Sequence, residues 1–113
     1  MSLATLFSNA AAAKLRQLTD RIGICLGKLT EDQIWARGGE NENAAGNLAL
    51  HLAGNVRQWI TSGLGGKPDI RERDREFSTR SGLSAAELTA RLRETVEEAA
   101  AVIAGLTEEQ LTR

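Results

Sequence analysis

The sequence predicts an all-α protein that forms one helical-bundle domain over residues 1–113. Apolar residues recur at three- and four-residue steps over long stretches, which is the period of an amphipathic helix. Several of these stretches follow a Ser or Thr with Glu or Gln three positions later, the pattern of a capping box. The 113 residues include one proline, so few breaks are imposed on the helices. A chain of this length can bury one modest core.

The first long helix is expected from about Leu3 to Lys28, with an apolar stripe at Leu15, Leu18, Ile22, Cys25, Leu26 and Leu29. Cys25, the only cysteine, is interpreted as a small core side chain. The phrase LTEDQIW follows, and its Thr30 and Gln33 form a capping box that restarts a short helix. Trp35 is expected to pack this turn onto the core.

The second long helix is expected from about Ala44 to Ser62, with Asn43 as its N-cap and Trp59 as a packing residue. Glycines and Pro68 end it, and the charged stretch DIRERDREFSTRSG makes a long connection anchored by Phe77. The alternating charges of RERDRE are typical of a solvated face.

The third long helix begins at a capping box of Ser84 and Glu87 and stops near Gly105. LTEEQL then repeats the earlier phrase LTEDQI with two conservative changes, Asp to Glu and Ile to Leu. Because the first copy leads into a long helix, the repeat predicts a fourth helix after Leu111. The sequence ends at Arg113, so we expect the fourth helix to be missing or supplied by another chain.

A polar ladder marks the second long helix, which is apolar over most of its circumference and is expected to be largely buried. Asn47, His51, Asn55 and Gln58 fall within about 80° of one another at 100° per residue. One interpretation is a structural network in which these groups hydrogen-bond one another and neighbouring helix ends. The other is that His51, the only histidine, binds a metal while an asparagine fixes its tautomer.

The segment NLALHLAGNVRQWI, followed by SGLGGKPDIRERDREF, resembles the DinB-like superfamily, which includes the YfiT-type proteins, and in particular its uncharacterised bacterial branch. The resemblance implies a four-helix bundle with a long crossover between the second and third helices. It also implies a divalent metal of the zinc or nickel class held by three histidines, of which His51 matches the first. No residue of this sequence matches the His-x-x-x-His pair of the last helix.

Two functions follow as expectations. The resemblance implies a metal-dependent enzyme, a transferase acting with a low-molecular-weight thiol, which would be inactive or incomplete with one of its three histidines. The alternative is a non-enzymatic helical scaffold or oligomerisation module, because three helices leave apolar surface that favours a homodimer. A weaker possibility is a small-molecule pocket with Arg57 and Gln58 as donors. No catalytic residue can be named.

The net charge and the hydropathy of the sequence indicate which classes of partner and which cellular compartment to expect. The net charge of -1 makes nucleic acid an unfavourable partner. No apolar run reaches the roughly 18 residues of a membrane span, and the N-terminus lacks the order of a secretory signal. We therefore expect a cytoplasmic protein without a membrane partner.

Overall fold

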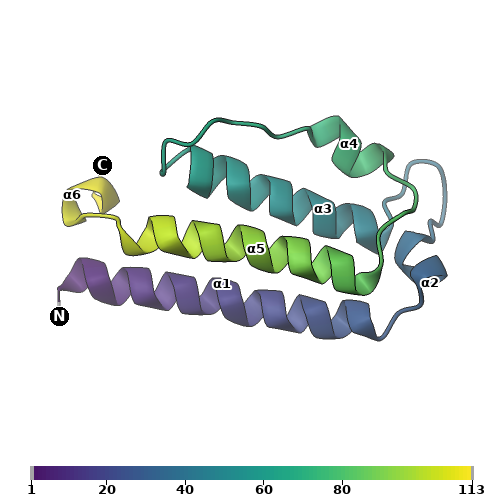
Figure 1. Ribbon diagram of the computed structural model, residues 1–113, viewed down its shortest axis with the longest axis horizontal. Coiled ribbons are helices and arrows are strands. Elements are labelled where there is room, and N and C mark those ends of the chain that lie inside the picture. The colour runs from purple at the N-terminus through teal and green to yellow at the C-terminus, as the bar shows by residue number, and fades with distance from the viewer. Residues whose placement is uncertain (1, 113) are drawn as a thin grey trace.

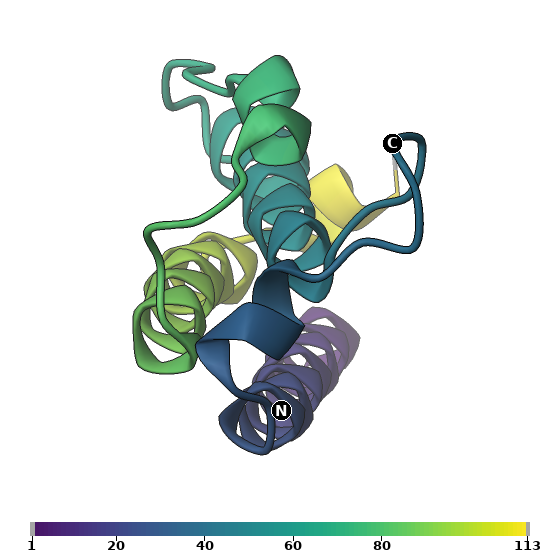
Figure 2. The same cartoon turned by 90° about the vertical axis from the view of Figure 1, so that its right-hand side faces the viewer.

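The computed structural model describes residues 2–112, and over this range the protein is all-α, as predicted. Three long helices, α1, α3 and α5, lie side by side, and Figure 1 shows α5 between the other two. Figure 2 looks along them and shows α4 on the outer side of α3. None of the helices in the described range is long and apolar enough to cross a membrane. The elements are α1 (Leu3–Gly27), α2 (Glu31–Trp35), α3 (Ala45–Val56), the π-helical η1 (Arg57–Ser62), α4 (Arg73–Ser78), α5 (Ala85–Ala104) and α6 (Glu108–Leu111).

Ser2 is the N-cap of helix α1, and its side chain accepts a hydrogen bond from the backbone N–H of Thr5. The helix packs along α5. Its buried residues are mostly small: Ser8, Ala12, Thr19 and Leu26. These small side chains allow close approach to α5 and decide which side of α1 faces inward. The prediction of a core position for Cys25 was therefore wrong, because Cys25 is exposed. Leu18, on the same side of the helix, is 44% exposed.

The short helix α2 closes one end of the core. Its predicted capping box is confirmed, with Thr30 and Gln33 each accepting a hydrogen bond from the other's backbone N–H. Ile34 is fully buried and joins a core cluster with Leu26, Ala49 and Leu88.

Trp35 packs this turn onto the molecule, as predicted. Its indole N–H donates to the carbonyl of Leu83 at 2.9 Å. Its ring lies against the backbone at Gly46, where a β-carbon would come within 2.7 Å of it. Trp35 therefore ties α2 both to the start of α3 and to the segment before α5.

Helix α3 begins one residue later than expected, since its N-cap is Ala44 and not Asn43. Alanine has no side-chain oxygen, so the cap is made from one side only, by the Asn47 side chain accepting from the Ala44 N–H. Most residues of this helix are buried or half-buried, but the prediction that Trp59 is a packing residue was wrong. Leu48, Leu52 and Trp59 are exposed, because α5 packs on another side of α3.

The long crossover returns along α3 so that α5 runs in the same direction as α3 (Figure 1). It contains the short helix α4, which the sequence did not reveal, and α4 packs on α3. Helix α5 has the predicted capping box of Ser84 and Glu87 and ends at Gly105. The repeated phrase also forms its predicted cap, with Thr107 and Gln110 at the start of α6.

Candidate functional site around His51

The polar ladder of α3 faces the crossover and α4. Asn47 is completely buried, and four hydrogen bonds use its amide fully. Its Oδ1 accepts from the Ala44 N–H at 3.1 Å and from Nη2 of Arg37 at 2.6 Å. Its Nδ2 donates to the carbonyls of Glu76 at 2.9 Å and Thr79 at 2.8 Å. A buried amide with all its partners avoids the cost of unpaired polar groups, so Asn47 holds the C-terminal part of α4 on α3.

An ion pair between Arg71 and Glu76 lies one turn further along α3. Nε of Arg71 donates to Oε2 of Glu76 at 3.0 Å, and Nη2 donates to Oε1 at 3.0 Å. The two side chains are only 9% and 8% exposed. The hydrogen bonds that Arg71 donates to Glu76 raise the pKa of its guanidinium above the ordinary value, although burial opposes them. The contact is bidentate, the geometry in which such pairs are strongest.

Gly54 makes room for this pair. A β-carbon at position 54 would overlap the Glu76 carboxylate and come within 3.2 Å of Nε of Arg71. The glycine in the sequence therefore marks a close approach, and the group that approaches is a carboxylate of this same chain.

His51 lies beside the ion pair. Its Nδ1 is 3.1 Å from Nη2 of Arg71 and 3.3 Å from Oε1 of Glu76. Its ring is 5.1 Å from the Phe77 ring, centroid to centroid, and tilted by 37° to it. The guanidinium carbon of Arg73 lies 5.5 Å from the centroid of the same Phe77 ring. The His51 ring is therefore held at its Nδ1 edge. Its side chain is 31% exposed, so part of the ring is open to solvent.

Gln58, on η1, and Asp69, in the part of the crossover before α4, extend the network. Oε1 of Gln58 accepts from Nη1 of Arg71 at 2.7 Å, and Nε2 of Gln58 donates to Oδ2 of Asp69 at 3.1 Å. The other oxygen of Asp69 accepts from the Arg71 backbone N–H at 3.0 Å. Each of the three nitrogens of the buried Arg71 guanidinium thus contacts a polar group on α3, η1 or the crossover.

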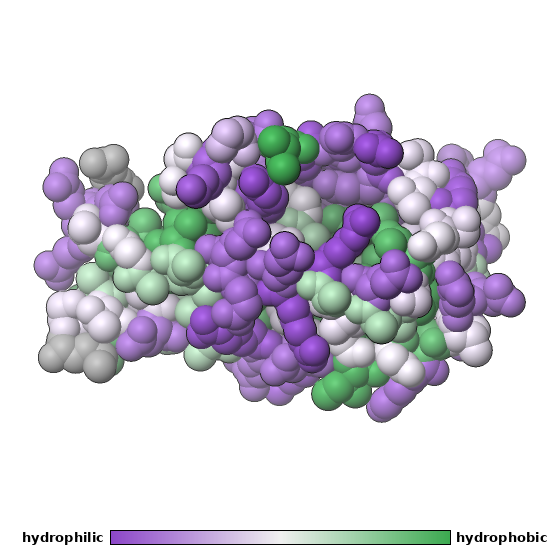
Figure 3. Space-filling model, in the orientation of Figure 1, coloured by the Kyte–Doolittle hydropathy of each residue, from purple (hydrophilic) through white to green (hydrophobic). Residues whose placement is uncertain are grey.

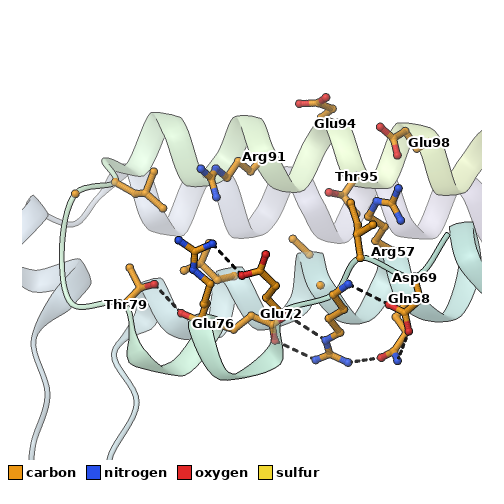
Figure 4. A pocket seen from close by; sticks show the side chains of 18 of the residues that line it. Arg57, Gln58, Asp69, Glu72, Glu76, Thr79, Arg91, Glu94, Thr95 and Glu98 are labelled. Carbon is orange, nitrogen blue, oxygen red and sulfur yellow. Dashed lines mark hydrogen bonds and ion pairs between the residues drawn. The ribbon is translucent and has the colours of Figure 1, made fainter.

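A polar cleft of about 620 Å³ lies on the neighbouring side, between the crossover with α4 and helix α5. Figure 4 shows Arg57, Gln58 and Asp69 at one end, with Arg91 on α5 toward the other. In Figure 3 hydrophilic side chains gather over this region of the surface. Arg57 and Gln58, which the sequence offers as donors for a small molecule, both line the cleft.

Three of the four ladder residues therefore meet in one network, namely Asn47, His51 and Gln58. Asn55 is half-buried and has no side-chain hydrogen bond within the described part of the chain. The residues that the sequence interpretation missed are Arg37, Asp69, Arg71 and Glu76. Assigning RERDRE to a solvated face was wrong for Arg71 and Glu76, which are its first and last residues. Gly54 was the available signal, because a glycine on the edge of the ladder indicates that another group comes close.

The metal implied by the family resemblance needs about three protein ligands. Among residues 2–112 no group of three His, Cys, Asp or Glu side chains could hold an ion. Near His51 the available carboxylate belongs to Glu76, and both of its oxygens already accept from Arg71. The described residues therefore do not fit a self-contained metal centre.

Comparison with known proteins gives the family but no characterised relative. No curated protein and no solved structure matches the chain. One family model, described as a protein of unknown function (DUF1572), matches residues 2–113. Because this match covers nearly the whole sequence, the chain belongs to the DUF1572 family.

Proposed function

We propose that this chain is a DinB-like helical bundle that acts as a self-association module and forms a homodimer through α3 and α1. Three long helices with a long crossover between the second and third support the DinB-like assignment. The internal bonding of the polar ladder supports a structural role for that ladder, since Asn47, His51 and Gln58 all contact polar groups of the same chain.

The observation that carries the proposal is an apolar stripe on the outside of α3 and η1. It consists of Leu48, Leu52 and Trp59, which are 49%, 41% and 65% exposed. A residue as large as tryptophan is costly to leave in water, since full burial of a large apolar side chain is worth about 1.5–3 kcal/mol. The side of α1 that carries Phe7 and Leu18 is exposed as well.

A second copy of this chain is the occupant that these features favour. In a two-fold dimer the same patch meets its copy, so the exposed side chains of both subunits are buried in one interface. The exposed stripe and the exposed side of α1 supply large apolar side chains of the kind that a standard interface of roughly 800 Å² per partner buries. With a net charge of -1, two copies repel each other little.

Sedimentation equilibrium tests the proposal with a matched pair of variants. Leu52→Glu places a charge in the stripe and should convert the dimer to a monomer. Ile70→Glu is the control, because Ile70 is 63% exposed but lies on the crossover, away from the stripe. The control should remain dimeric. A wild-type protein that is monomeric at all concentrations, or a Leu52→Glu variant as dimeric as the control, would overturn the proposal.

A second candidate is the metal-dependent transferase that the resemblance implies. The observation that favours it is the Glu76 carboxylate 3.3 Å from Nδ1 of His51, because metal-bound histidines usually have a carboxylate or carbonyl on their other nitrogen. The remaining ligands would have to come from outside residues 2–112. Metal analysis of the purified protein and of His51→Ala tests this: the same metal content in both removes His51 as a ligand.

A further inference from the structure

We infer that Arg71 holds the neutral His51 ring in the tautomer with its proton on Nε2, so that this histidine is a hydrogen-bond donor with no free lone pair for a metal. The inference is independent of self-association. It concerns the one residue of the chain that the family resemblance assigns to a metal.

The positions of the protons on Arg71 carry the argument. Nη2 of Arg71 has two hydrogens and no acceptor lone pair. One hydrogen is directed to Oε1 of Glu76 at 3.0 Å, which leaves the second for Nδ1 of His51 at 3.1 Å. Nδ1 can receive that hydrogen only with its lone pair, and Nδ1 is therefore the unprotonated nitrogen.

The competing arrangement is a proton on Nδ1 donated to Glu76. It would place two N–H groups, those of Nη2 and Nδ1, against each other at 3.1 Å. Both would also compete for Oε1, which lies nearer to Nη2, at 3.0 Å, than to Nδ1, at 3.3 Å. Arg71 cannot relieve the conflict by losing a proton, because its pKa is raised further by Glu76.

The rest of the network prevents Arg71 from turning away. Its Nη1 donates to Gln58 at 2.7 Å and its Nε to Glu76 at 3.0 Å, so the plane of the guanidinium is fixed by three other contacts. Gly54 lies so close to this pair that neither side chain has room to shift toward α3. Arg71 is thus a positioning residue for the His51 ring.

The consequence lies at the other nitrogen. Nε2 carries the proton and has no hydrogen-bond partner within the described residues, while the side chain is 31% exposed. Such an N–H binds an acceptor oxygen of a carbonyl, carboxylate or phosphate. A metal at Nε2 would need the proton moved to Nδ1, against Arg71. The arrangement therefore disagrees with the ligand role that the resemblance implies.

Nuclear magnetic resonance of the ¹⁵N-labelled wild-type protein tests the inference directly. The spectra are recorded at about pH 8, because the two ring nitrogens of a neutral imidazole have distinct shifts, that of the N–H and that of the bare nitrogen. We expect Nδ1 to resonate as the unprotonated nitrogen and Nε2 as the protonated one. A protonated Nδ1, or an equal mixture of the two forms, would overturn the inference.

Two variants separate the roles of the ion-pair partners. Glu76→Gln retains Arg71 and should retain the Nε2–H tautomer, whereas Arg71→Gln should lose it. The same spectra under zinc titration should show no saturable shift of the wild-type His51 resonances. A saturable shift in the wild type contradicts the inference, and the wild-type spectrum decides even if a variant does not fold.

Discussion

The carboxylate of Glu76 lies directly against the backbone of Gly54, so closely that a β-carbon at position 54 would overlap it. Two residues 22 positions apart are thus fitted to each other, and the buried ion pair of Glu76 with Arg71 depends on this fit. The same relationship explains why a helix that runs along the crossover contains a glycine there.

Gly54→Ala should therefore destabilise the protein, although Gly→Ala within a helix is normally favourable by about 0.5–1 kcal/mol. The added methyl must displace Glu76 from Arg71, and we expect a loss of about 2–3 kcal/mol in the free energy of unfolding. Gly27→Ala is the control, since open space surrounds a β-carbon at that position. Urea denaturation of the two variants measures the difference, and equal stability would contradict the close fit.

Asn47→Ala should cost about 3 kcal/mol. It removes the partner of the Ala44 N–H and of the Glu76 and Thr79 carbonyls, and buried groups left unpaired cost about 1–3 kcal/mol each. Asn55→Ala, on the same helix, should change the free energy of unfolding by less than about 1 kcal/mol, because no hydrogen bond of its side chain exists in the described range. Equal stability of the two variants in urea denaturation would mean that the hydrogen bonds of Asn47 do not stabilise the fold.

Glu76→Gln should destabilise the protein by about 3 kcal/mol, since it leaves the buried Arg71 without its counter-charge. Replacing both residues, as in the Arg71→Met and Glu76→Met double variant, should be less costly than Glu76→Gln alone, because no buried charge remains unpaired. A double-mutant cycle of Arg71→Met, Glu76→Met and the double variant, followed by urea unfolding, measures this coupling. Additive effects of the two single changes would mean that the pair is not coupled.

The contact between α1 and α5 should give a small dependence of stability on pH. Arg16 donates to Glu97 at 2.8 Å, and this hydrogen bond lowers the pKa of the Glu97 carboxyl. A lowered pKa in the folded state stabilises the protein above the ordinary glutamate pKa of about 4.3, and the stabilisation is lost as the pH falls through the folded value. The difference in the free energy of unfolding between the wild type and Arg16→Gln should therefore vanish below the pKa of Glu97 in the folded protein. A difference that persists at pH 2 would contradict this. Both side chains of this ion pair are more than half exposed, so added salt should also weaken the stabilisation that the pair provides.

Elements set by neighbours in the sequence could be predicted. The capping boxes at Thr30, Ser84 and Thr107 depend on residues three positions apart, and all three form. The common side of Asn47, His51 and Gln58 follows from the helical period alone. These features need no knowledge of the rest of the chain.

Features set by packing between distant segments could not be predicted. Which side of α1 faces inward depends on its fit to α5, and the small residues Ala12 and Thr19 decide it against Leu18 and Cys25. Burial of Arg71 and Glu76 depends on the crossover lying against Gly54. Within the sequence their alternating charges look the same as those of a solvated loop.

The two tryptophans provide the most direct measurement of self-association, because their indole N–H resonances can be followed by NMR during dilution. Trp59 lies in the exposed stripe, and Trp35 is bonded to the Leu83 carbonyl at 2.9 Å and serves as an internal control. A homodimer formed through α3 predicts that the Trp59 resonance shifts with protein concentration while that of Trp35 stays constant. A Trp59 resonance that does not change from millimolar to micromolar concentration would contradict the account.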